Sequence, residues 1–157
     1  MMKKIAVLLL LPLLILCSCG KKTVSEMSAG EIIDAVYRKV NARDYMKGLK
    51  SELTTEEITI ENEEYYLGVT GVPYVSGAAS EAVVQPVTYS FCVIRLKEGC
   101  DYDAERIKIE NNINKGKWVC ARADEAYVVR SGDLIAVIMG TKEACDGIEA
   151  AFLKIVK

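Results

Sequence analysis

The first twenty residues restrict the fold most, because they contain an apolar run that a folded domain cannot use. Lys3 and Lys4 precede a continuous apolar run from Ile5 to Leu16. As a helix this run would be roughly 18 Å long, too short for a bilayer core of roughly 30 Å. A charged start, a short apolar core and a small-residue junction are typical of a secretory signal peptide, which is removed from the mature protein. The fold must therefore be built from the residues that follow.

The junction Leu16-Cys17-Ser18-Cys19 resembles the lipobox of bacterial lipoproteins. Leu16, Ser18 and Cys19 occupy the aliphatic, small and invariant cysteine positions of that pattern, and Cys17 fills the remaining one. Cleavage before Cys17 would leave the bulky Leu16 at the cut, so Cys19 is the expected lipidation site. The resemblance implies a diacylglyceryl group on the Cys19 sulfur, and two or more chains hold a protein firmly on a membrane. The alternatives are an ordinary secretory peptide with incidental cysteines and a retained membrane anchor.

The charge and the length of the remaining chain limit which classes of protein it can belong to. After residues 1–18 are removed, 18 basic and 22 acidic residues remain, a formal charge of −4. This balance argues against a nucleic-acid binder, which would carry a basic stripe. About 139 residues are enough for one domain with its own core. The chain has no histidine, the commonest general base and transition-metal ligand.

Four cysteines remain in the domain, and none of them forms a C-x-x-C pair. They are Cys92, Cys100, Cys120 and Cys145. In an extracytoplasmic protein four cysteines could form two disulfides in three connectivities. Their irregular spacing favours free thiols, and the disulfide alternative stays open.

The chain pattern predicts a short polar tether at residues 19–27 and a single domain at residues 28–157. Ser28 and Glu31 fit a capping box for a helix to about Asn41, while residues 42–56 are ambiguous. The following segments are expected in order: a strand near 65–69, a Gly-rich loop at 71–82, a strand within 83–96, a helix from Asp101 or Asp103 to about Asn114, a hairpin of 127–129 with 134–139, and a last helix capped by Thr141. This order predicts an α+β domain with an about four-stranded, largely antiparallel sheet and helices mainly on one face.

From Ser28 onward the chain resembles small lipoproteins of Gram-positive bacteria that carry a domain of unknown function. The resemblance lies in the capped first helix, in the strand VTYSFCVIRL with the helix DAERIKIENNI, and in the hairpin AYVVRSGDLIAVIMG with the closing helix CDGIEAAFLKIV. It implies a lipoprotein on the outer face of the cytoplasmic membrane, and it carries over no active-site residue.

Three groups of residues could carry chemistry, and each has a plainer explanation. The acidic cluster Glu56, Glu57, Glu61, Glu63 and Glu64 could ligate calcium, but it lacks the spacing of a calcium loop and reads more simply as a solvated face. Asp101 and Asp103 are explained by helix capping. Tyr65, Tyr66 and Tyr74 could line a ligand groove, although packing at a sheet edge is the simpler interpretation.

No catalytic constellation emerges from the sequence. A serine nucleophile would need lysine as its base, and no G-x-S-x-G or S-x-x-K motif is present. A reactive Cys120 near Arg122 would lack its usual histidine partner. We therefore expect a non-enzymatic binding or interaction module with no cofactor and no metal, held at the membrane by its lipid and meeting an envelope protein. The alternatives are a solute- or envelope-component-binding protein serving a transporter or wall machine, and an enzyme acting on envelope polymers.

Overall fold

One antiparallel sheet forms the centre of the computed structural model, which describes residues 22–40, 49, 52–84 and 86–157. Its strand order is β1-β2-β3-β5-β4, and every neighbouring pair is antiparallel. The strands are β1 (Leu53–Glu57), β2 (Tyr74–Ala82), β3 (Ser90–Leu96), β4 (Glu125–Ser131) and β5 (Leu134–Gly140). The helices are η1 (Val24–Glu26), α1 (Ala29–Lys39), α3 (Glu63–Leu67), α4 (Tyr102–Asn112) and α5 (Lys142–Ile155). The expected α+β class is confirmed, with five strands instead of about four.

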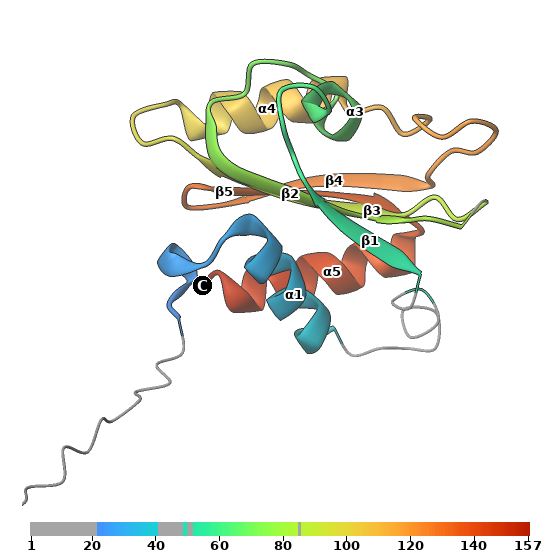
Figure 1. Ribbon diagram of the computed structural model, residues 1–157, viewed down its shortest axis with the longest axis horizontal. Coiled ribbons are helices and arrows are strands. Elements are labelled where there is room, and N and C mark those ends of the chain that lie inside the picture. The colour runs from blue at the N-terminus through green and yellow to red at the C-terminus, as the bar shows by residue number, and fades with distance from the viewer. Residues whose placement is uncertain (1–21, 41–48, 50–51, 85) are drawn as a thin grey trace, which may run out of the picture.

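Helices cover both faces of this sheet, whereas the sequence predicted them mainly on one. Figure 1 shows α1 and α5 below the sheet and α3 and α4 above it. Strand β5 is the reason, because all seven of its residues are buried and it needs an apolar layer on each side. Its even-numbered residues Leu134, Ala136 and Ile138 belong to the lower core, and Ile135 and Val137 belong to the upper core.

The two helices of the lower layer begin with the caps that the sequence predicted. The Ser28 side chain accepts a hydrogen bond from the Glu31 backbone N–H, and the Glu31 carboxylate accepts one from the Ser28 N–H. The Thr141 side chain accepts from the Ala144 N–H at the start of α5. Ile32, Ile33 and Val36 of α1 are fully buried against the sheet, together with Ile148 and Phe152 of α5.

Two segments, one above the sheet and one within it, have a different structure from the one that the sequence predicted. A strand was expected near residues 65–69, but residues 65–67 belong to helix α3, which ends at Gly68 with φ 73°. Residues 74–82, expected as a loop, form strand β2, the longest strand in the described chain. Strand β2 uses small residues because its neighbours approach closely: a Cβ on Gly77 would lie 3.0 Å from the Ile58 Cβ.

The residues just before α1 are attached to the domain instead of forming a free tether. Val24–Glu26 make a turn of 3₁₀ helix, and Val24 and Met27 pack against the lower core. The Arg95 Nη2 donates to the Val24 carbonyl oxygen at 2.7 Å and to the Met27 carbonyl oxygen at 3.3 Å. The Arg95 Nη1 also donates to Asp133 Oδ2 at 2.7 Å. The ordered domain therefore includes residues 23–27, before the expected start at Ser28.

Of the remaining predictions, some are confirmed and others concern residues that the structure does not describe. The hairpin of β4 and β5, helix α4 and the last helix are confirmed. Cys92, Cys100, Cys120 and Cys145 are free thiols, as favoured, with Cys92 and Cys145 buried. The predicted signal peptide with Cys19, and most of the ambiguous segment 42–56, lie outside the described residues. Within the described ranges, no helix combines the length and the apolar character that crossing a bilayer requires.

Candidate functional site

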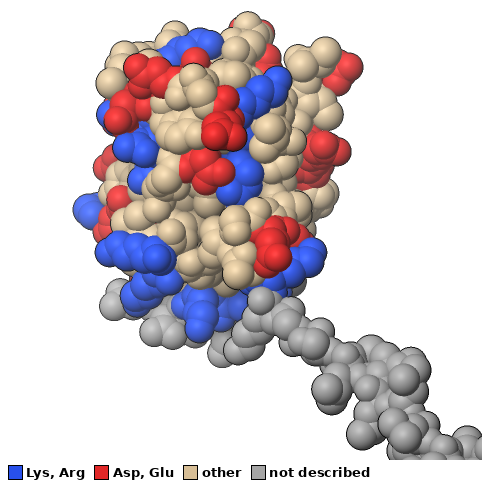
Figure 2. Space-filling model, turned by 90° about the vertical axis from the view of Figure 1, so that its left-hand side faces the viewer, with Lys and Arg blue, Asp and Glu red and all other residues tan. Residues whose placement is uncertain are grey.

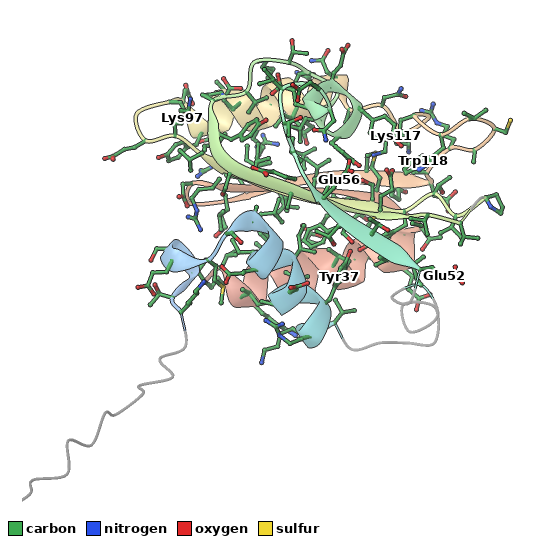
Figure 3. The ribbon with its side chains drawn as sticks, in the orientation of Figure 1. Tyr37, Glu52, Glu56, Lys97, Lys117 and Trp118 are labelled. Atoms are coloured by element: carbon green, nitrogen blue, oxygen red, sulfur yellow. The ribbon has the colours of Figure 1, made fainter. Side chains whose placement is uncertain are left out.

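A buried lysine, Lys117, is the centre of the most unusual cluster in the described chain. It lies in the connection between α4 and β4, which crosses above one end of the sheet (Figure 3). Its side chain is only 3% exposed, and its Nζ lies 2.9 Å from Glu81 Oε1. The ammonium also donates a hydrogen bond to Ser90 Oγ at 3.1 Å. Since Glu81 and Ser90 are directly paired residues of β2 and β3, the sheet register places both partners beneath the same cation.

Three aromatic rings surround the same ammonium. The Lys117 Nζ lies 4.2 Å from the ring centroid of Tyr65, 4.6 Å from that of Tyr66 and 5.1 Å from that of Trp118. These distances are within the range of cation–π attraction, which strengthens where the cation is desolvated. Tyr65 and Tyr66 come from α3 and pack edge to face, with centroids 5.0 Å apart. We call Lys117, Glu81, Ser90, Tyr65, Tyr66 and Trp118 the lysine cage.

Carboxylates on the strands fix the two tyrosine hydroxyls of the lysine cage. The Tyr65 hydroxyl donates to Glu81 Oε2 at 3.1 Å, and the Tyr66 hydroxyl donates to Glu56 Oε1 at 2.5 Å. Burial and, next, the nearby Glu81 carboxylate raise the pKa of Tyr65 to about 12. The hydroxyls therefore stay protonated at neutral pH and act as hydrogen-bond donors. The ring orientations follow from these bonds.

The lysine cage has the composition of a serine–lysine dyad but not its accessibility. Ser90 is fully buried, so no substrate carbonyl can reach its Oγ. The Lys117 ammonium is already engaged by the Glu81 carboxylate and the Ser90 hydroxyl. The neighbouring Cys92 is buried as well, and burial raises the pKa of its thiol to about 11. The arrangement binds a cation, and the cation it holds is the protein's own lysine.

The acidic cluster predicted from the sequence is dispersed in the structure. Glu56 faces Tyr66, whereas Glu63 is buried and accepts a hydrogen bond from the Gly71 backbone N–H. Glu61 accepts a hydrogen bond from the Thr59 hydroxyl. Within the described ranges, no three Cys, Asp or Glu side chains converge as metal ligands would. These glutamates therefore act in local hydrogen bonds and on the solvated surface.

The other residues that the sequence singled out also have local roles. Asp101 caps α4 by accepting from the Ala104 N–H at 3.0 Å, and Asp103 pairs with Arg130 at 2.8 Å. The Tyr74 hydroxyl donates to the Ile58 carbonyl oxygen, away from the lysine cage. Cys120 is exposed and has φ 130°, with no cationic partner among its described contacts. Of the three tyrosines considered, the structure brings only Tyr65 and Tyr66 together.

An open groove lies on the lower face, between the start of α1 and the edge of the sheet. Its volume is about 390 Å³, and its floor is made of small residues of α1 and β2, including Gly30, Gly77 and Ala78. Thr55, Glu56 and Glu57 of the edge strand β1 form one wall. The Glu56 carboxylate is turned to Tyr66 on the other side of the sheet, so Glu57 is the carboxylate available to this groove, and it would suit a cationic group.

Comparison with known proteins finds no match for this chain. No protein-family model matches it. No curated protein sequence matches it, and no solved structure does. The case for function therefore rests on this chain's own residues.

Proposed function

We propose that this protein is an extracytoplasmic lipoprotein, anchored through Cys19, whose domain serves as a binding module and not as an enzyme. The observation that supports the proposal is the short distance along the chain between lipobox and domain. Only Gly20, Lys21 and Lys22 separate Cys19 from Thr23, the residue that caps the first helical turn η1. A domain built so close to its anchoring residue is suited to work at the membrane surface.

The lysine cage supports the choice of binding over catalysis. Its one cation, Lys117, is satisfied by Glu81 and by three aromatic rings, and its one hydroxyl nucleophile is closed to solvent. Such a network stabilises one arrangement of α3 and the connection above the sheet. It gives the domain a rigid end on which a partner can be recognised.

The anchor is tested with a pair of cysteine variants. Cys19→Ala should move the protein from the membrane fraction to the soluble fraction, and the mass of a diacylglyceryl group should disappear from its N-terminal peptide. Cys17→Ala is the matched control and should stay in the membrane fraction. The anchor proposal fails if Cys19→Ala pellets with membranes as the wild type does. Crosslinking in native membranes, followed by mass spectrometry, then identifies the partner.

The groove beside α1 favours a second candidate, a protein that binds a small solute or envelope component. Its volume of about 390 Å³ is at the lower end of ordinary ligand sites. Glu57 on its wall would select a cationic ligand, such as an amine-bearing envelope fragment. Titration with short lysine peptides, followed by NMR shifts of Gly30 and Gly77, tests this candidate. Glu57→Gln should weaken any binding there, and Glu64→Gln, outside the groove, should not.

A further inference from the structure

We propose that Arg95 fixes the orientation of the domain on the membrane, with the end that carries Asp133 facing the lipid surface and the lysine cage pointing away. This inference rests on the proposed lipid anchor at Cys19. It concerns which face of the domain meets the lipid headgroups and which face remains free for a partner.

The N-terminal segment is attached to the domain through Arg95. Arg95, whose side chain is 13% exposed, donates to the carbonyl oxygens of Val24 and Met27 and pairs with Asp133. Next to this contact, the Lys22 ammonium pairs with the Glu31 carboxylate. We call these contacts the N-terminal clamp. The clamp binds backbone carbonyls, so it holds the path of the chain and not merely one side chain.

Only a short length of chain is left between the clamp and the anchor. Four residue steps lead from Cys19 to Thr23. An extended chain covers at most about 3.5 Å per residue, so Thr23 lies within about 14 Å of Cys19. The surface around the clamp therefore cannot move far from the headgroups once Cys19 is lipidated.

The lysine cage and the clamp lie near opposite ends of strand β3. Ser90, beneath Lys117, is the first residue of β3, and Arg95 lies near the other end of the same strand. Five residues of strand separate them by about 17 Å. Figure 3 shows Lys97 at one end of the molecule and Lys117 with Trp118 at the other. Strand β3 therefore acts as a spacer between a membrane end and a distal end.

The charge of the clamp end agrees with a lipid surface as its neighbour. Figure 2 looks onto this end and shows Lys and Arg side chains gathered along its lower edge, with acidic side chains more frequent higher up. Basic side chains near a leaflet are attracted to anionic headgroups. The lower edge, beside which the described chain begins, is therefore the edge we place nearest to the lipid.

Two native cysteines allow a direct test. Cys100 follows β3 at the clamp end, and the exposed Cys120 lies beyond the lysine cage at the distal end. Lipidated full-length protein with Cys120→Ser is labelled at Cys100, and protein with Cys100→Ser is labelled at Cys120. Each is reconstituted into phosphatidylcholine–phosphatidylglycerol vesicles that contain an acceptor-labelled lipid. Energy transfer should be at least about twofold more efficient from Cys100, because the two ends of β3 are about 17 Å apart.

Two further variants show whether the clamp causes the orientation. Arg95→Met should reduce the difference between the two dye positions, whereas Arg130→Met, on the edge strand β4, should keep it. Should Arg95→Met not fold, a six-residue Gly-Ser insertion between Lys21 and Lys22 tests the other part of the proposal, that the short connection holds the clamp end at the lipid. It leaves the clamp intact, lengthens the connection, and should lower transfer from Cys100.

The outcomes separate this inference from the proposed function. Equal transfer from the two positions, or stronger transfer from Cys120, overturns the orientation while leaving the anchor in place. No transfer from either position, together with an unmodified Cys19 by mass spectrometry, overturns the anchor and the orientation with it. A difference that survives both Arg95→Met and the insertion shows that the clamp is not its cause.

Discussion

Lys117 and Glu81 form an ion pair whose lysine side chain is almost completely withdrawn from solvent. The Nζ lies 2.9 Å from Glu81 Oε1, while the hydrogen bond of the ammonium is directed at Ser90 Oγ. Glu81 Oε1 is buried and receives no aligned hydrogen bond from the described residues, so its contact with Lys117 is one of charge. Burying both ions costs desolvation energy, which the pair and the aromatic rings offset.

The first prediction concerns the loss of that cation. Lys117→Met should lower the free energy of unfolding by about 3 kcal/mol, because it leaves the Glu81 carboxylate buried without a counter-charge. Urea unfolding followed by tryptophan fluorescence measures the change. Lys142→Met, which breaks the exposed pair with Asp146, is the control and should leave the midpoint almost unchanged. Equal effects of the two variants would contradict the role assigned to the lysine cage.

The second prediction concerns alkaline pH. Burial raises the pKa of Tyr37 to about 12, whereas tyrosine in an unfolded chain titrates near 10. The folded state thus keeps a proton that the unfolded chain releases. The stabilisation is complete below about pH 10 and is lost as the pH rises towards about 12.

Urea unfolding between pH 9 and pH 11.5 measures this loss. Tyr37 alone should account for roughly 2 kcal/mol of it, an order-of-magnitude figure. Tyr37→Phe should show a shallower decline with pH than the wild type, because the variant has one titrating group fewer. Parallel slopes for the two proteins would show that Tyr37 does not contribute.

Local signals explain which parts of this fold the sequence could predict. The Ser28 and Thr141 caps, and Gly132 in the hairpin turn with φ 59°, depend on residues only a few positions apart. Such short-range patterns can be recognised in a single sequence. Helix α3 was missed because Tyr65 and Tyr66 favour strands by propensity, while their packing on β2 and β3 favours a helix. Strand β2 was missed because glycine, serine and alanine are typical of loops. Their use in a strand is explained only by the close approach of neighbouring side chains, which the sequence does not show.

The lysine cage could not be predicted for a related reason. Lys117 lies 36 positions from Glu81 along the chain and 27 from Ser90. Nothing in the segment around Lys117 and Trp118 indicates burial, since it reads as a polar connection after a helix. The only useful sign was the pair Tyr65-Tyr66, which the sequence assigned to a sheet edge. The contacts follow from the strand register, which a single sequence does not specify at this range.

The third prediction concerns the four thiols of the domain. Cys120 is exposed and should react with a thiol reagent within the mixing time of a manual assay. Burial raises the pKa of Cys92 to about 11 and that of Cys145 to about 12, so both should react only when the chain unfolds. Cys100, whose S–H donates to the Lys97 carbonyl oxygen at 3.1 Å, should react at an intermediate rate.

Ellman's reagent without denaturant tests this order on a Cys17→Ala, Cys19→Ala protein, which keeps only the four thiols of the domain, and denaturant should then release the two buried thiols. Cys120→Ser should abolish the fast phase and leave the others. Rapid reaction of Cys92 or Cys145 in the folded protein would contradict their burial.

The last prediction compares two glycines that share a left-handed backbone. Gly68 ends α3 with φ 73°, and Gly71 follows with φ 70°. A Cβ on Gly68 would come within 2.3 Å of the Asn112 carbonyl oxygen at the end of α4, whereas a Cβ on Gly71 meets nothing within 4 Å. Gly71→Ala should therefore cost only the backbone strain, about 1 kcal/mol. Gly68→Ala adds a clash with backbone that cannot move without separating α3 from α4, and should cost at least about 3 kcal/mol. Urea unfolding of the two variants measures the difference, and equal costs would show that α3 and α4 do not pack as closely as described.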